Sequence, residues 1–328
     1  MTAEAAPDEA PEAALAFVEA GLGAALATVT ETWGSAPRPA GSQLAVGGDG
    51  ALVGSVSGGC VEGAVVAEAR EAIADGAPRL LEYGVADEDA FAVGLACGGT
   101  IRILLEPIGG LGPDPELLAA IVEARAARRP VVYAVRPGDW SRRLISDPSD
   151  PLWPEAAEVL RLDRSGFVGA WFLQALNPAP RLVIVGAAHV AQHLAPMARI
   201  AGFDVTVVDP RGAFATEARF PGSRLMVELP DEALAEIGLD SRVAVVTLTH
   251  DPKIDDPAIE AVLASDAFYL GCLGSRKTHG QRLERLAAHG DALARIHAPV
   301  GLAIGARTPA EIAVSILAEI VARLRLPG

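Results

Sequence analysis

The sequence predicts an α/β protein with a C-terminal Rossmann-like, doubly wound parallel sheet and an N-terminal mixed α/β domain. Beyond residue 181, short apolar runs alternate with helical stretches, which is the order expected of a parallel sheet. The first of these runs, 182–185, breaks into a glycine turn that opens a helical pattern. Earlier in the chain, the runs 43–46 and 51–55 flank a Gly-Gly-Asp-Gly turn, which is typical of a β-hairpin.

These patterns divide the chain into two regions. We expect the N-terminal α/β region to cover 9–176, with 111–176 as a bridging segment, and the Rossmann-like nucleotide-binding domain to cover 181–328. The linker between them is the proline-rich stretch 177–180.

The elements of the first region follow from apolar spacing and turn residues. Val61, Val65 and Ile73 mark an approximate helical stripe, and the residues from Thr100 onward alternate like a strand. In chain order we expect a helix over 10–21, a strand over 24–30, the hairpin strands 43–46 and 51–55, a helix over 60–74, a strand over 100–105, a helix over 115–127, and strands over 130–135 and 166–173.

The second region contains five apolar runs of strand length. We expect strands over 182–185, 204–208, 224–227, 243–247 and 267–272. The closing helix has a clear start, because Thr308 can cap it, Pro309 suits its first position and Glu311 completes a capping box.

Length and charge limit the class of protein. The 328 residues suffice for two domains with buried cores, and 51% of them are hydrophobic and 21% charged, as in a globular protein. The formal net charge of −15 argues against DNA or RNA as a partner, since neutralising phosphates needs clustered Lys and Arg.

The cysteines and the N-terminus indicate the compartment. Three scattered cysteines are too few for a disulfide framework, so a reducing cytoplasm is expected. Residues 1–12 have neither the basic start nor the apolar core of a signal peptide, and no apolar run approaches the ~20 residues that a membrane span requires. We therefore expect a cytoplasmic protein that does not contact membranes.

The turn after the run 182–185 is a candidate dinucleotide site. Gly186 can make the sharp turn, Ala188 occupies the usual second glycine position, and a helix follows. Asp209 comes 23 residues after Gly186, where an acidic side chain would bind ribose hydroxyls. Arg211 follows two residues later, so a nucleotide with a 2′-phosphate is not excluded. The alternative is a doubly wound domain without a bound nucleotide.

Further polar residues follow the carboxyl ends of the predicted strands. Ser275 and Arg276 form a plausible anion site at a helix start. His189 and His250 could be acid–base groups or polar contacts, and each could equally be a hydrogen-bonding structural group. Cys272 lies in an apolar strand and is expected to be inert core.

Two glycine-flanked cysteines mark a second candidate site. Cys60 follows Ser57, Gly58 and Gly59 and opens the helix expected over 60–74, where unpaired N–H groups and the helix dipole would stabilise a thiolate. Cys97 lies in another glycine turn, which also holds Gly98. The pair makes no zinc motif, and tight turns that happen to contain cysteine are the plain alternative.

A third glycine-rich loop precedes these. It contains Arg38, whose guanidinium could grip a phosphate or pterin group or could only be a solvated turn residue.

Together these motifs resemble the XdhC/CoxI family of molybdenum-cofactor accessory proteins, which serve xanthine dehydrogenase and carbon monoxide dehydrogenase type hydroxylases. The resemblance covers most of the chain and has seven motifs in the right order. They are Gly34 to Gly41, Gly54 to Gly63, Cys97 to Thr100, the turn from Gly186 to Ala191, Leu248 to Pro252, Gly274 to Arg276, and Gly301 to Ile312.

The resemblance implies a protein that binds molybdenum cofactor (molybdopterin, in its plain or cytosine dinucleotide form). It would hold the cofactor while a cysteine desulfurase supplies the terminal sulfido ligand, and pass it to an apo molybdenum hydroxylase. It also implies a homodimer, and a chaperone rather than an enzyme.

Cys60 and Cys97 match the family's glycine-flanked cysteine positions, and the other site residues come from the sequence patterns described above. Cys60 and Cys97 are expected to contact the metal or its sulfur, and the C-terminal crevice to hold the nucleotide part of the cofactor or a separate NAD(P). The cofactor-binding set is Arg38, Ser57, Gly58, Gly59, Cys60, Glu62, Cys97, Gly98, Gly186, Ala188, His189, Asp209, Arg211, His250, Ser275 and Arg276.

Two other functions fit parts of the sequence. An NAD(P)-dependent oxidoreductase would use His250 or His189 as acid–base group and Lys277 to orient a carbonyl. A nucleotide-sensing regulatory module would touch no molybdenum. The oxidoreductase leaves the two glycine-flanked cysteines unexplained.

Overall fold

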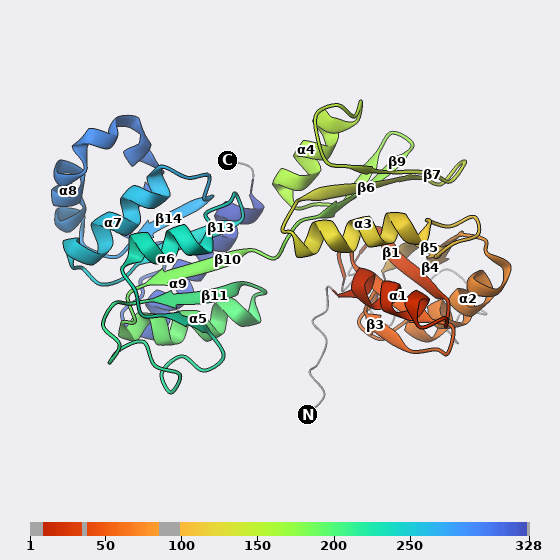
Figure 1. Ribbon diagram of the computed structural model, residues 1–328, viewed down its shortest axis with the longest axis horizontal. Coiled ribbons are helices and arrows are strands. Elements are labelled where there is room, and N and C mark those ends of the chain that lie inside the picture. Colours follow the sequence, from red (N-terminus) through yellow and green to blue (C-terminus); the bar gives the residue numbers. More distant parts are fainter. Residues whose placement is uncertain (1–8, 35–37, 85–98, 327–328) are drawn as a thin grey trace. The chain divides into compact units, whose positions relative to one another are not determined.

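The computed structural model describes residues 9–34, 38–84 and 99–326 (Figure 1). The chain divides into two compact units between Pro178 and Ala179, here called unit 1 and unit 2. Unit 2 contains a parallel six-stranded sheet and unit 1 contains antiparallel sheets with helices, so the predicted fold class is confirmed. No helix in the described part of the chain has both the length and the apolar sequence for a membrane span.

The first sheet of unit 1 is antiparallel and has the strand order β3-β2-β1-β5-β4. Helix α2 covers one face through Val65, Ala69 and Ala72. Helix α1 packs against the other face through Ala10 and Ala14. The elements are α1 (Ala10–Glu19), β1 (Ala24–Trp33), β2 (Gln43–Gly47), β3 (Leu52–Gly54), α2 (Glu62–Asp75), β4 (Arg79–Tyr83), β5 (Thr100–Pro107) and α3 (Pro115–Ala126).

A second antiparallel sheet, with the order β7-β6-β9-β8, completes unit 1. The prediction of one strand over 166–173 was wrong, because Gly169 takes a φ of 58° and turns the chain back into a hairpin. The elements are β6 (Val131–Arg136), β7 (Ser141–Ile145), α4 (Trp153–Leu162), β8 (Gly166–Val168) and β9 (Trp171–Leu176).

A buried ion pair joins the two sheets of unit 1. Arg142 of β7 donates from Nε to Glu106 Oε1 of β5 at 2.6 Å, and the Tyr133 hydroxyl of β6 donates to the same carboxylate at 3.0 Å. Only 4% of the Glu106 side chain is exposed, so the guanidinium and the phenol replace the water that this carboxylate loses.

Unit 2 is built on a parallel sheet with the order β12-β11-β10-β13-β14-β15. The five predicted strands are present, and a two-residue strand extends the sheet. The strands are β10 (Arg181–Val185), β11 (Asp204–Val208), β12 (Arg224–Met226), β13 (Val243–Thr247), β14 (Tyr269–Cys272) and β15 (Ile296–His297). The helices are α5 (His189–Ile200), α6 (Pro230–Ile237), α7 (Pro252–Leu263), α8 (Arg276–Arg285), a 3₁₀ helix (Ala287–Arg295) and α9 (Pro309–Arg325).

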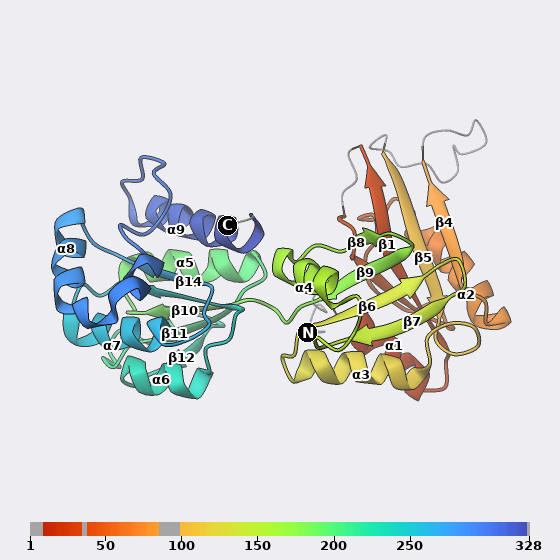
Figure 2. The same cartoon turned by 90° about the horizontal axis from the view of Figure 1, so that it is seen from above.

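Successive side chains of β10 point to opposite faces of this sheet, and the chain is apolar at both sets of positions. Leu182 and Ile184 pack toward α5 and α9, whereas Val183 and Val185 pack toward α6 and α7. Figure 2 shows the two pairs of helices on opposite sides of the sheet. The order runs β10-β11-β12 in one direction and β10-β13-β14 in the other, so the switch point of a doubly wound sheet lies between β10 and β13.

Candidate functional site

The glycine-rich segments of unit 1 are connected to the strands of its first sheet at one and the same edge. The antiparallel register pairs Trp33 with Thr100, and it places Gly54 opposite Leu44 and Tyr83 opposite Ile101. The chain therefore enters the segments 34–42, 55–61 and 84–99 from the same edge, the upper edge of this sheet in Figure 2. Cys97 and Gly98 lie outside the described residues.

The segment 55–61 folds around a carboxylate of its own. Glu62, the first residue of α2, accepts backbone N–H bonds from Val56, Ser57 and Gly59 at 3.2, 2.9 and 2.9 Å. It also accepts from the hydroxyls of Ser55, at 2.7 Å, and of Ser57. The loop thus resembles an anion-binding nest whose anion is supplied by the chain itself.

The charge state of Glu62 follows from these bonds. Partial burial acts to raise the pKa of its carboxyl, but the hydrogen bonds from Ser57 and Ser55 outweigh it and lower the pKa from 4.5 to about 2. The carboxylate is therefore ionised at neutral pH and holds the loop in one conformation.

This arrangement corrects the prediction that Cys60 begins the helix. Helix α2 begins at Glu62, with Val61 as its N-cap, and Cys60 lies before it as an exposed residue. The N–H groups of Ser57 and Gly59 in the preceding turn point to the Glu62 carboxylate. Glu62 holds the loop, and Cys60 lies at its surface.

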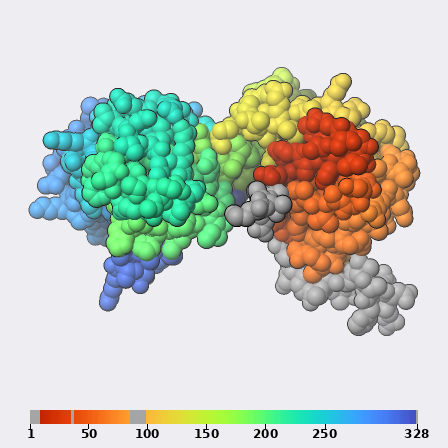
Figure 3. All heavy atoms as spheres, turned by 60° about the horizontal axis from the view of Figure 1, so that its bottom comes forward, coloured from red at the N-terminus to blue at the C-terminus, as the bar shows by residue number. Residues whose placement is uncertain are grey.

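Space is open beside Cys60. A Cβ atom on Gly59 or Gly63 would meet nothing within 4 Å among the described residues, so packing within the chain does not explain glycine at Gly63 in the first turn of α2. Helix α2 and its surroundings reach the surface of unit 1 (Figure 3, orange). At the same sheet edge, the Nε atom of Arg38 is buried and has no hydrogen-bond partner in the part of the chain that is described.

In unit 2, the glycine turn and the loop after β13 meet at the switch point. Gly186 has a φ of 104°, and a Cβ there would lie 2.5 Å from Thr249 Cγ2. Only glycine fits this close approach. Ala188 is the N-cap of α5, and His189 is its exposed first residue.

Asp209 lies beneath this turn with its side chain fully buried. Its Oδ2 accepts from Ala187 N and Arg211 Nη2, both at 2.8 Å, and its Oδ1 accepts from Arg211 N and Nε at 2.9 and 2.8 Å. Burial acts to raise the pKa of Asp209, but the bonds from Arg211 and Ala187 outweigh it and lower the pKa. The carboxylate that was expected to bind a ribose is thus hydrogen-bonded within the protein on both of its oxygens.

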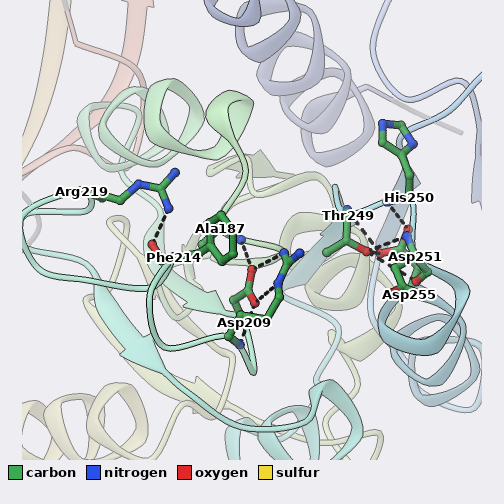
Figure 4. Close-up of polar contacts among 9 residues, drawn as sticks. Ala187, Asp209, Phe214, Arg219, Thr249, His250, Asp251 and Asp255 are labelled. Carbon is green, nitrogen blue, oxygen red and sulfur yellow. Dashed lines mark hydrogen bonds and ion pairs between the residues drawn. The ribbon is translucent and has the colours of Figure 1, made fainter.

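A second buried carboxylate shapes the loop after β13 (Figure 4). Asp255 accepts from the Thr249 hydroxyl at 2.6 Å and from the His250 N–H at 3.1 Å. His250 is exposed and has a φ of 63°, which is unusual for a residue other than glycine. Burial raises the pKa of Asp255. The imidazole of His250 is thus displayed at the switch point by a constrained loop.

The remaining residues that were singled out in unit 2 differ in their exposure and contacts. Ser275 is the N-cap of α8, and its hydroxyl oxygen accepts from Thr278 N at 3.1 Å. Arg276 and Lys277 are exposed in the first turn of α8. Cys272 is fully buried, and burial raises the pKa of its thiol to about 11, which agrees with an inert core position.

Sequence reasoning missed three residues that lie around this switch point. Asp255 organises the loop after β13, and Phe214 and Arg219 lie beside Arg211. A local signal existed, because Phe214 and Arg219 follow Arg211 within eight residues of loop. Across the described ranges, no group of three or more His, Cys, Asp or Glu side chains could hold a metal ion.

Comparisons with known proteins cover most of the chain. The model of the XdhC and CoxI family matches residues 17–84, and the model of the XdhC Rossmann domain matches residues 182–320.

Two curated relatives align with nearly the whole chain. The molybdenum cofactor insertion chaperone PaoD of Escherichia coli is 33% identical over 93% of this chain and 85% of its own length. A Bacillus subtilis protein, described as a probable xanthine dehydrogenase subunit, is 30% identical over 91% of this chain and 92% of its own length.

One solved structure has the same fold. The crystal structure of a protein described as a xanthine dehydrogenase from Bacillus halodurans is 25% identical, with a TM-score of 0.74 over 97% of this chain and 96% of the other.

Proposed function

Because the chain belongs to the XdhC and CoxI family, we propose that it binds molybdenum cofactor and inserts it into a xanthine dehydrogenase-type molybdenum hydroxylase. Its relative PaoD is named a molybdenum cofactor insertion chaperone, and the name of the Bacillus subtilis relative refers to xanthine dehydrogenase. In this proposal the cofactor is a cargo that the chain holds and releases, while a cysteine desulfurase provides the terminal sulfido ligand.

The observation that carries the proposal is the convergence of the glycine-rich segments at one sheet edge, with an exposed thiol there. Cys60 is exposed, and the described residues leave the space at Gly59 and Gly63 open, so a bulky ligand can approach them closely. The buried Nε of Arg38, which has no hydrogen-bond partner among the described residues, would donate to an oxygen of a phosphate or pterin. These groups fit a large anionic ligand that carries a soft metal or sulfur atom.

The roles of the chain's own residues follow from their positions. In this proposal Cys60 contacts the metal or its sulfur, and Cys97, which lies outside the described residues, has the same role. Ser57, Gly58 and Glu62 shape the loop that presents Cys60, so Glu62 acts through position and does not touch the cargo.

Metal content tests this proposal directly. We expect the protein purified from a host that makes the cofactor to carry molybdenum, and Cys60→Ala to lower the amount retained, with a further loss in the double variant with Cys97→Ala. Cys272→Ala, which removes a buried thiol, is the control and should retain the metal. Full molybdenum content in the double variant would rule out the thiol contacts.

The crevice of unit 2 supports a second part of the proposal, which is a nucleotide bound at the switch point. The turn at Gly186 opens α5, and the N-terminus of a helix favours phosphate. This ligand is either the nucleotide part of the cofactor's cytosine dinucleotide form or a separate NAD(P).

One observation favours an oxidoreductase instead. The exposed imidazole of His250 is displayed at this switch point, where the substrate of a dehydrogenase would lie. Steady turnover of NAD(P)H with carbonyl substrates, abolished by His250→Ala, would establish that function. A homodimer and a cytoplasmic location remain predictions, and light scattering of the purified protein would test the first.

A further inference from the structure

At the ribose position of the proposed nucleotide site in unit 2, the contacts among the described residues leave Asp209 without a free acceptor. A carboxylate offers about four lone-pair positions, and four N–H groups occupy those of Asp209: one from Ala187 and three from Arg211. The side chain of Asp209 is also 0% exposed. A free ribose diol, which needs an acceptor for its hydroxyl hydrogens, finds none at this residue.

Positive charge occupies the place of that acceptor. The Arg211 guanidinium lies 4.6 Å from the centre of the Phe214 ring, and the Arg219 guanidinium lies 5.6 Å from the same centre. Two cations therefore flank one ring, and Phe214 is 43% exposed. Both described hydrogen-bond partners of Arg219 are neutral, namely Phe214 O at 2.6 Å and Gln192 Oε1 at 3.3 Å.

These cations lie next to the phosphate-binding turn. Arg211 and the N–H of Ala187 share the acceptor Asp209 Oδ2, which places the guanidinium at the turn before α5. Gln192 belongs to α5, so Arg219 reaches the same helix. Arg211 pairs with Asp209, and this contact, together with the charges of Asp251 and Asp255, raises its pKa, so the guanidinium stays charged.

We infer that this crevice takes a nucleotide whose ribose carries a 2′-phosphate, as in NADP(H), in preference to one with a free ribose diol. Arg211 and Arg219 bind the phosphate, and Phe214 with the stacked Arg211 offers a flat surface to the base. The inference rests on the nucleotide part of the proposed function and chooses between its two ligands.

Calorimetry with two small probes tests the inference on the full chain. Adenosine 2′,5′-bisphosphate and 5′-AMP differ only in the 2′-phosphate, and we expect the bisphosphate to bind at least tenfold more tightly. Arg219→Ala keeps the pair of Asp209 and Arg211 and should reduce that ratio several-fold. Arg211→Ala should bring it close to one, and circular dichroism checks that this variant folds.

A matched control removes a cation elsewhere in unit 2. Arg224 is the first residue of β12, so it lies at the amino ends of the strands, whereas the proposed nucleotide site lies at their carboxyl ends. It pairs with the exposed Glu236. Arg224→Ala should leave the ratio unchanged. Equal binding of the two probes, tighter binding of 5′-AMP or CMP, or no binding of either would overturn the inference.

Molybdenum content separates this test from that of the proposed function. Retained molybdenum without a preference for the bisphosphate overturns the inference about Arg211 and leaves the cofactor proposal standing. A clear preference for the bisphosphate in a protein that never carries molybdenum overturns the cofactor proposal and leaves the inference about Arg211 standing.

Discussion

Replacing Glu62 by glutamine should loosen the loop that presents Cys60 while leaving the fold of unit 1 in place. The Glu62 carboxylate accepts three backbone N–H bonds and two hydroxyl bonds. Glutamine has nearly the same shape, but it keeps a single acceptor oxygen and turns an NH₂ group toward N–H donors that it cannot accept from.

The magnitude follows from the bonds lost. A hydrogen bond to a charged group contributes about 1.5–3 kcal/mol, and roughly half of the five bonds are lost. Water reaches this partly exposed loop and replaces some of the partners, so we expect the loop-opening free energy to fall by about 2 kcal/mol rather than by the full sum.

Hydrogen exchange of the peptide covering residues 54–62 measures this opening. A loss of about 2 kcal/mol corresponds to roughly 30-fold faster exchange. Glu71→Gln on the same helix is the control, because that side chain is 72% exposed, and it should change exchange little. Exchange in Glu62→Gln within threefold of the wild type would refute the role given to the carboxylate.

The same carboxylate predicts an acid response. Its pKa is about 2 in the folded protein and 4.5 ordinarily, so the stabilisation is complete above pH 4.5 and is lost as pH falls toward 2. Loop exchange, corrected for its intrinsic pH dependence, should stay level from pH 7 to 5 and rise only in stronger acid. The glutamine variant should lack this rise, and a rise near pH 6 in the wild type would contradict the assignment.

Three further substitutions and one chemical treatment test the packing. Gly186→Ala should cost about 2–4 kcal/mol in thermal unfolding, because of its φ of 104° and the contact with Thr249, whereas Gly280→Ala in α8, where a Cβ meets nothing within 4 Å, should stabilise by about 0.5–1 kcal/mol. Arg142→Ala should cost about 3–5 kcal/mol because it leaves a buried carboxylate without its cation, and a loss below 1 kcal/mol in denaturant unfolding would show that the pair is dispensable. Iodoacetamide at pH 8 should leave Cys272 unmodified in the native protein by peptide mass mapping, and its native labelling would contradict the burial of that thiol.

The parallel sheet of unit 2 was predictable because its inner strands are buried on both faces. Such strands read as unbroken apolar runs, as in 182–185 and 243–247. Strand β7 was missed because its sequence, Ser-Arg-Arg-Leu-Ile, has no apolar alternation. It forms through pairing with β6, and Arg142 is accommodated only because Glu106, 36 residues earlier, lies buried opposite it.

The candidate site was predictable in its residue types but not in its contacts. The glycine pattern located Gly186 and the loop around Cys60, since both depend on local turns. The fourfold engagement of Asp209 depends on the N–H of Ala187, 22 residues earlier, and on the rotamer of Arg211. Likewise, nothing in a helical stripe reveals that Glu62 folds back onto the residues before it.

The antiparallel first sheet of unit 1 separates two kinds of loop. The tight turn at 48–51, between β2 and β3, lies at the far ends of the strands from Trp33, Gly54 and Thr100. A fluorophore or surface tether attached at Asp49 would therefore lie at the end of this sheet opposite to the one that carries Cys60. Asp49 is therefore a suitable position for attaching the protein to a label or a surface in experiments that follow cargo transfer.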